Sequence, residues 1–481
     1  MPLPKRPNKR PGIFVEELTT LPPSIFTVET ALPAFIGYTQ KADNELQGDL
    51  HLKPFRIASM ADYIRYFGAA QPETGIKVHV TETRGSDGKT LTLSAEAALE
   101  KKERSRHIMY YALQMFFANG GGLCYIVSVN PYKTPGSPLE ESELKAGLDA
   151  LAAVNDPTLI LFPEAQRLDT IESFRSLHDL ALQQCSDIKN RFVIMDIYQS
   201  ASPSETETDI DDALMQFRND GIGPDNLMYG AAYAPDLFTT LELSVDEHMT
   251  EVMHTLNETA TVSVTLGSLK TSGSSIYEPA RNAVYDLKCI LPPSAAMAGI
   301  YATVDRERGV WKAPANITLN SVTGTTLRIA SAQQEKFTID PRSGKSINMI
   351  RTFPGTGTLV WGARTLAGND QEWRYLNVRR FISSVEESIK RGLAPFVFEP
   401  NNERTWLRIQ AMIQNYLYGF WQQGALQGAK PEEAFFIALG LGKTMTEQDI
   451  LDGHLIVETG LATSRPAEFI MVRLVQKMAA I

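Results

Sequence analysis

Short apolar runs alternating with amphipathic stretches predict an α/β core in the first half of the chain. Five runs rich in β-branched and aromatic residues are typical of buried strands: residues 34–38, 124–129, 158–162, 192–197 and 227–233. Apolar residues three and four apart predict helices over 104–118 and 170–185. Because strands and helices alternate along 144–200, we expect a parallel sheet covered by helices.

The rest of the chain adds β-rich and helical segments to this core. Residues 76–93 predict a β-hairpin with its turn at 86–88, and residues 315–360 are β-rich. Two polar stretches, 199–212 and 267–276, are expected to be surface loops. Two long helices are predicted over 379–392 and 402–423. The expected fold class is therefore mixed α/β (α+β), in more than one domain.

Both ends of the chain carry strand-like segments that stand apart from this core. Residues 13–18 follow a Pro-rich basic tail, and residues 469–475 lie close to the C-terminus. A lone strand leaves backbone hydrogen-bonding groups unsatisfied, so each segment must join a sheet in its own subunit or in a neighbouring one. Spacing alone favours pairing within the subunit, and donation to a neighbour remains the alternative.

The predicted helix over 402–423 has two distinct faces. Its apolar stripe consists of Trp406, Ile409, Ile413, Leu417 and Phe420. Arg404 and Arg408 are one turn apart and project together on another side. This second face is either simply solvated or contacts an acidic partner.

Composition and charge restrict the class of protein. The chain has 46 basic and 56 acidic residues and a formal charge of -10, which argues against a nucleic-acid-binding protein. Its three widely spaced cysteines form no metal-binding or disulfide pattern, and Cys124 and Cys289 lie in apolar runs typical of buried thiols. No secretory signal and no membrane-spanning run is seen. We expect synthesis in a reducing cytoplasm.

Motifs for catalysis or cofactor binding are incomplete. Three Gly-Lys-Ser/Thr triplets lack the glycine that a phosphate-binding loop needs five residues earlier, since Thr83, Ile339 and Ile437 stand there. His248 and His254 are expected on a solvated acidic helix, on roughly opposite sides of it. Asp196 ends a predicted strand, where a loop-capping carboxylate is favoured over a catalytic one. We therefore expect no catalytic residue, no cofactor and no metal.

Several stretches together resemble the contractile tail sheath family of phages and phage-tail-like extracellular injection systems. Near the N-terminus these are residues 11–17 (PGIFVEE) and 30–38 (TALPAFIGY). Towards the C-terminus the similar stretches are residues 291–316, 348–355 (NMIRTFPG), 360–366 (VWGARTL), 373–380 (WRYLNVRR) and 398–401 (FEPN). Residues 40–280 resemble the family only in outline.

The resemblance implies a structural subunit that is not an enzyme. Such subunits polymerise as stacked hexameric rings around an inner tube and contract to drive the tube through a target envelope. The implied partners are further copies of the chain, the inner tube protein, and baseplate and terminator or cap proteins, with no nucleic acid and no membrane insertion. The particle would assemble in a bacterial cytoplasm and be a virion or a phage-tail-like particle released by lysis.

The resemblance also implies a division of the chain and a role for its ends. Residues 1–30 would form an N-terminal arm, 31–345 an outer α/β region with a variable part at about 40–280, 346–465 an inner tube-facing domain, and 466–481 a C-terminal arm. The arms would donate strands to neighbouring subunits through Ile13, Phe14, Val15, Glu16, Phe469, Ile470, Met471, Val472 and Leu474. Arg404 and Arg408 would contact the tube.

Other functions remain open at this point. An α/β hydrolase would need a nucleophile motif, which is not seen. A tube, capsid or baseplate subunit is disfavoured by the length and the long helices of the chain. A two-component sheath of the type VI secretion kind is a closer alternative, although this chain carries both arms and all the motifs itself.

Overall fold

The computed structural model describes residues 24–87, 89–100, 103–198, 207–257, 259–260, 263–327, 329, 331–338 and 340–468. The chain forms two compact units. The larger unit takes Thr27–Glu387 and the segment from Thr463 onward, and the smaller unit takes Ser388–Ala462 with the described residues up to Phe26. The predicted arm strands at 13–18 and 469–475 lie outside the described residues.

An eight-stranded sheet forms the centre of the larger unit. Its strand order is β16-β15-β8-β7-β6-β1-β5-β2, parallel from β15 to β5 and antiparallel at both edges. The strands are β1 (Pro33–Thr39), β2 (Phe55–Ile57), β5 (Cys124–Pro131), β6 (Leu159–Leu161), β7 (Phe192–Asp196), β8 (Gly230–Ala234), β15 (Ile347–Phe353) and β16 (Gly357–Trp361). The predicted parallel sheet is thus confirmed.

Helices cover both faces of this sheet because alternate strand residues point to opposite sides. On β1, Phe35 packs into one apolar cluster with α1, α2 and α8, whereas Ala34 and Ile36 pack into another with α3 and α4. The helices in this part of the larger unit are α1 (Met60–Phe67), α2 (Met109–Ala118), α3 (Glu141–Ala152), α4 (Ile171–Ile188), α5 (Glu207–Gln216), α8 (Ser294–Arg308) and α9 (Ser331–Thr338).

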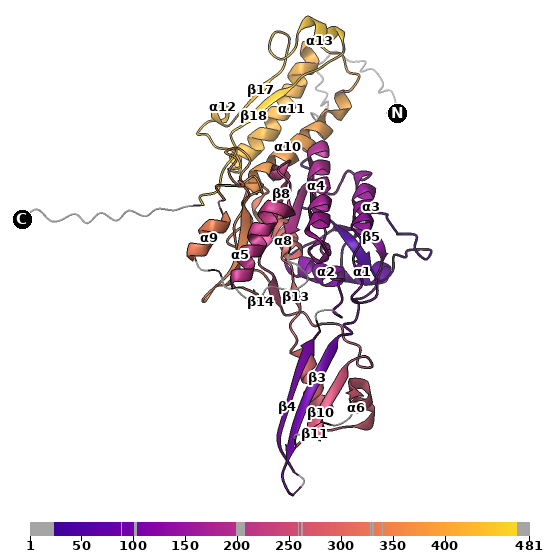
Figure 1. Ribbon diagram of the computed structural model, residues 1–481. Helices are drawn as coiled ribbons and strands as arrows, with labels where there is room; N and C mark the ends of the chain where they lie inside the picture. Colours follow the sequence, from indigo (N-terminus) through magenta and orange to yellow (C-terminus); the bar gives the residue numbers. More distant parts are fainter. Residues whose placement is uncertain are drawn as a thin grey trace, which may run out of the picture. The chain divides into compact units, whose positions relative to one another are not determined.

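A second sheet has five strands (Figure 1) and its own apolar core. Its path is β11-β10-β3-β4, with β12 paired to β10. The elements are β3 (Ile76–Arg84), β4 (Thr90–Leu99), β10 (Glu251–Leu256), β11 (Thr259–Ala260), β12 (Val264–Thr265), α6 (Leu266–Ser272) and α7 (Tyr277–Tyr285). The predicted hairpin is confirmed by the antiparallel pairing of β3 with β4. A small sheet of β9 (Leu237–Thr239), β13 (Ile290–Leu291) and β14 (Val322–Thr325) completes the larger unit.

The smaller unit is built on two long helices and a short two-stranded sheet. Helix α10 (Leu376–Leu393) begins in the larger unit and ends in the smaller one. The remaining elements are α11 (Glu403–Gln422), α12 (Pro431–Ala434), β17 (Phe435–Ala438), α13 (Glu447–Leu451) and β18 (Glu458–Leu461). Both predicted long helices are confirmed.

Four sequence-based expectations were wrong in detail. The helix predicted over 104–118 begins only at Met109, since the preceding backbone is bound by Glu73 and Glu164 side chains. Parts of both predicted loops are helical, as α5 and α6. Helix α9 interrupts the β-rich stretch. The predicted acidic helix around His254 is the strand β10, which pairs with β3 along its whole length.

Candidate assembly surfaces

Helix α11 buries its apolar stripe and exposes its arginine face. Asn402 caps its first turn by accepting a hydrogen bond from the backbone N–H of Thr405. Ile409, Ile413 and Leu417 are fully buried, as the periodicity predicts, while Arg404 and Arg408 are exposed. The sequence therefore placed both faces of this helix correctly.

The two arginines of α11 differ in their surroundings. The guanidinium of Arg408 lies 5.3 Å from the ring centre of Phe396, and its Nη1 is 3.9 Å from a carboxylate oxygen of Glu399. Arg404 makes no ion pair or hydrogen bond with any residue that the structure describes. Arg404 is thus the more available of the two for a partner carboxylate.

Three exposed apolar side chains, on α11 and in the segment before it, were not predicted from the sequence. Leu407, between the two arginines on α11, is 59% exposed, Val397 is 63% exposed, and Phe398 is fully exposed. Phe398 also has a φ of 71°, a conformation uncommon for a residue other than glycine. Apolar groups exposed in this way are typical of a protein interface.

The two-stranded sheet of the smaller unit has unpaired edges. β17 and β18 pair with each other in antiparallel register from Phe435 with Leu461 to Ala438 with Glu458. Beyond this ladder, the Phe435 N–H donates to the Pro431 carbonyl of α12, and the described part of the chain provides no other backbone hydrogen bond to either strand. An isolated pair of strands is marginally stable in water, so these edges are suited to accept further strands.

The polar groups expected to have no catalytic role are held in structural contacts. The Asp196 carboxyl group accepts hydrogen bonds from the backbone N–H of Ser294 at 2.8 Å and from its hydroxyl at 2.6 Å, at the start of α8. Burial raises the pKa of Asp196 to about 8. His254 Nε2 lies 3.0 Å from the Glu82 carboxylate, on the neighbouring strand. Within the described residues, no group of three His, Cys, Asp or Glu side chains is placed to hold a metal ion.

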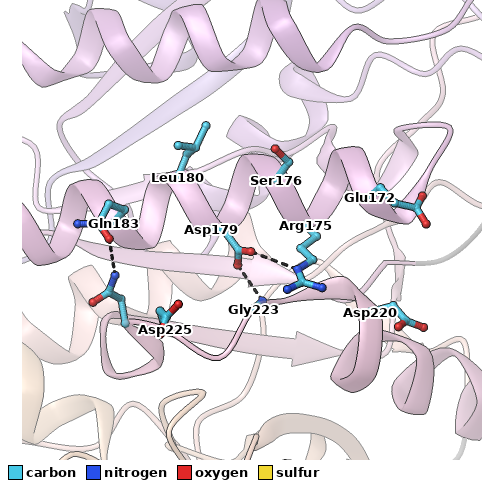
Figure 2. Close-up of a pocket in the computed structure, with 10 residues that line it drawn as sticks. Glu172, Arg175, Ser176, Asp179, Leu180, Gln183, Asp220, Gly223 and Asp225 are labelled. Atoms are coloured by element: carbon cyan, nitrogen blue, oxygen red, sulfur yellow. Dashed lines mark hydrogen bonds and ion pairs between the residues drawn. The ribbon is translucent and has the colours of Figure 1, made fainter.

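A polar cavity of about 580 Å³ lies along α4 (Figure 2). Asp179 accepts hydrogen bonds from Arg175 Nε at 3.3 Å and from the backbone N–H of Gly223 at 2.8 Å. Gln183 accepts one from Asn226 at 2.9 Å. These contacts hold the 217–226 segment on the helix, so the side chains that line the cavity already serve the fold.

Comparison with known proteins shows which class of assembly has this architecture. The family model of the phage tail sheath C-terminal domain matches residues 368–477. The sheath of an extracellular contractile injection system, the PVC complex in its contracted state, has 29% identity and a TM-score of 0.64, over 98% of this chain and 99% of its own. The contracted helical sheath of the anti-feeding prophage has 30% identity and a TM-score of 0.63, over 98% of this chain and 100% of its own. The chain belongs to the contractile tail sheath family.

Other relatives are also components of contractile tails and injection systems. A chain of the six-fold symmetrised baseplate of the anti-feeding prophage has 30% identity and a TM-score of 0.62, with 98% and 100% of the two chains covered. A prophage major tail sheath protein of Pseudomonas aeruginosa strain UCBPP-PA14 is 28% identical over 120 residues, which is 25% of this chain and 30% of that relative. This sheath subunit therefore aligns with less than a third of the length of the prophage relative. It aligns with nearly the whole length of the injection-system relatives.

The resemblance seen in the sequence is confirmed, and so is the mixed α/β fold class. The relatives are structural sheath proteins, which implies a role other than catalysis for this sheath subunit. None of the helices in the described ranges is long and apolar enough to cross a membrane.

Proposed function

We propose that the chain polymerises as stacked hexameric rings around an inner tube and contracts to drive that tube through a target envelope. The observation that carries this proposal is the match over 98% of the chain to a helical sheath in its contracted state. The match to a chain of a six-fold symmetrised baseplate supports the ring of six. A head-to-tail interface that does not close on itself generates such a helical stack.

Strand exchange would hold the stack together. The two open edges of β17 and β18 would accept one strand each from neighbouring copies. The donors would be the predicted arm strands, with Ile13, Phe14, Val15 and Glu16 at one end of the chain. At the other end they would be Phe469, Ile470, Met471, Val472 and Leu474. A four-stranded sheet shared between copies satisfies the backbone groups that two strands alone leave open.

The tube would contact the smaller unit. In this proposal residues 346–465 form the inner part of the sheath and residues 31–345 the outer part. Arg404, Leu407 and Arg408 share one exposed face of α11 because they are three and four residues apart. Two cations around an exposed leucine fit an acidic tube surface with an apolar patch. Individual exposed ion pairs are weak, but every ring repeats them.

Contraction would use free energy stored during assembly. The extended sheath would be kinetically trapped, and triggering would let subunits rotate as nearly rigid bodies into larger interfaces. The shared strands would survive this rotation and keep the copies connected. No nucleotide is needed for such a step, in agreement with the incomplete phosphate-binding motifs.

The other partners would be a baseplate and a terminator or cap protein. The sheath would be made and assembled in a bacterial cytoplasm. It would leave the cell by lysis, within a virion or a phage-tail-like particle.

Truncation of the arms tests this proposal. Deletion of residues 1–18 or 466–481 should give a folded monomer that does not polymerise, because each deletion removes one donated strand and spares the described helices and strands of both units. Circular dichroism and thermal unfolding report the fold, and negative-stain microscopy with sedimentation reports the polymer. Full-length tubes built by a truncated chain would show that the arms are not donors.

A further inference from the structure

Two buried arginine clusters lie where the described chain approaches its predicted arms. We call Arg364, Tyr375 and Glu468 the C-terminal clamp, and Thr30, Asp305 and Arg380 the N-terminal clamp. All six residues lie in the larger unit. Glu468 is the last residue before the predicted C-terminal arm strand, and Thr30 precedes β1.

The C-terminal clamp holds Glu468 by three donors. Arg364 Nε and Nη2 donate to the two carboxylate oxygens at 2.9 and 2.5 Å, and the Tyr375 hydroxyl donates at 3.2 Å. The Arg364 side chain is only 4% exposed, and that of Glu468 only 20%. A bidentate arginine–carboxylate pair fixes orientation as well as distance.

The Asn348 side chain fixes the backbone of the arginine in this clamp. The buried Asn348 amide of β15 accepts a hydrogen bond from the Arg364 backbone N–H at 2.7 Å and donates one to its C=O at 2.8 Å. Arg364 Nη1 also donates to the Gly368 carbonyl at 3.0 Å. The guanidinium is therefore held in place by the sheet, and Glu468 is the part that docks onto it.

The N-terminal clamp is built in the same way from α8 and α10. Arg380 Nη1 and Nη2 donate to the Asp305 carboxylate at 3.1 and 2.5 Å. Asp305 accepts the Thr30 hydroxyl at 2.6 Å, and Arg380 donates to the Thr30 carbonyl at 3.0 Å. The guanidinium lies 4.5 Å from the ring centre of Tyr301. Thr30 is thus held through both its side chain and its backbone.

We propose that these two clamps are the anchor points that tie the arms to the larger unit and through which each arm pulls on it. This inference rests on the proposed strand exchange. Terminal segments unfold locally unless side-chain contacts hold them. A donated strand that pulled on such a segment would detach it from the larger unit, and the subunit itself would not move. Buried ion pairs add little net stability over apolar packing, so a role in fixing position explains them better than a role in stability alone.

The two clamps lie at different distances along the chain from their arms. Phe469 follows Glu468 directly, so the copy that accepts the C-terminal strand must lie close to the C-terminal clamp. On the N-terminal side, the described residues up to Phe26 belong to the smaller unit, so the arm does not leave the subunit at Thr30 itself. The N-terminal clamp therefore fixes the point at which the segment that leads to this arm enters the larger unit.

Matched substitutions with hydrogen exchange of assembled sheaths test the anchors. E468Q keeps the shape of the side chain and one acceptor oxygen but loses the negative charge. T30V loses only the hydroxyl, which donates a hydrogen bond to Asp305. Their controls are E372Q and T27V, at exposed positions of the same unit. We expect about tenfold faster exchange at residues 463–468 in E468Q and at 24–32 in T30V, as expected for a lost charge-assisted hydrogen bond. Sheaths of both variants should dissociate at lower urea, whereas both controls should behave as wild type.

The outcomes separate this inference from the proposed function. Equal exchange and equal urea resistance of variants and controls would show that the clamps do not anchor the arms. A purely structural role would lower the melting temperature of the monomer and leave local exchange in the sheath unchanged. If E468Q fails to fold, R364K retains the charge with fewer donors and should show the same local effect. Polymerisation of a chain lacking residues 466–481 would instead contradict strand donation itself.

Discussion

At the scale of single residues, Asp196 couples the central sheet to the pH of the solution. Its carboxyl group is buried at the end of β7 and caps the first residues of α8. Burial raises its pKa to about 8 from the ordinary value of 3.8 for an aspartate. Between these two pH values the folded chain holds a proton that the unfolded chain releases. The contribution of this group to stability is therefore fully present at low pH and is lost as the pH rises towards 8.

The substitution D196N should flatten this pH dependence. Asparagine keeps the shape and the acceptor for the Ser294 backbone N–H but does not titrate. In urea unfolding at pH 5, 6.5 and 8, the wild type should lose up to about 1.4 kcal/mol per pH unit through this group. The variant should lose less over the same range, while Asp236, whose pKa is also raised by burial, leaves a residual slope. Identical slopes for the two proteins would mean that Asp196 is ionised in the fold.

Single residues were predictable where their chemistry is local. Cys124 and Cys289 are buried free thiols, as their apolar neighbours indicate. Asp196 is a capping carboxylate, as its place at a strand end suggests. The role of His254 was missed because its partner Glu82 is far away in the sequence, and only the pairing of β10 with β3 brings them together. For the same reason no local pattern pointed to Glu468 as the partner of Arg364.

At the scale of elements, the exposed face of α11 offers a direct test of the proposed tube contact. R404E should weaken tube binding by several-fold more than R408E, because Arg408 already interacts with Phe396 and Glu399 in its own subunit. Added salt should weaken wild-type binding and reduce the difference between the variants. Co-sedimentation of the sheath protein with preformed inner tubes at two salt concentrations measures this.

The exposed Lys443 of the same unit provides the control. K443E makes the same change in formal charge outside α11, so it should bind as wild type. An equal loss in K443E and R404E would indicate a general effect of charge and no contact at α11.

Long helices with a regular spacing of apolar residues were predictable from the sequence, and short polar helices were not. Helices α4, α10 and α11 have 18, 18 and 20 residues, enough for a complete apolar stripe. Helix α6 has only seven, and its sequence LGSLKTS reads as a loop. It forms because Thr265 caps its first turn and because Leu266 and Leu269 pack into the core of the five-stranded sheet. Tertiary packing thus decided this element, as is common for short helices.

At the scale of the whole molecule, the order of the chain conceals its division into parts. The two compact units divide within α10, between Glu387 and Ser388, where neither composition nor charge changes. The five-stranded sheet is assembled from two separate stretches, one around β3 and β4 and the other from β10 to α7. The hairpin of the first stretch was predictable from the sequence. Its pairing with the second stretch was not, since the parallel pairing of β10 with β3 is a long-range contact.

The five-stranded sheet has its own apolar core, which predicts that it is dispensable for the body of the subunit. The chain enters and leaves it at points that are already adjacent. Glu100 donates its backbone N–H to the Gly75 carbonyl at 2.9 Å, and Thr239 donates to the Cys289 carbonyl at 3.1 Å. Each gap can therefore be closed by a two-residue Asn-Gly turn that replaces 76–99 or 240–288.

The shortened chain should fold with a modest loss of stability and still polymerise, as a thinner sheath. The loss arises because Leu241 and Leu243 no longer pack against the central core. Two hydrogen bonds of the Ser244 backbone, with the Glu73 N–H and the Tyr111 hydroxyl, are also lost. Thermal unfolding measures the stability, and negative-stain microscopy measures the sheath diameter. A chain that folds but forms no sheath would place an essential contact between copies on the five-stranded sheet. The sheet would then belong to the interface between copies and not only to the outer part of the sheath.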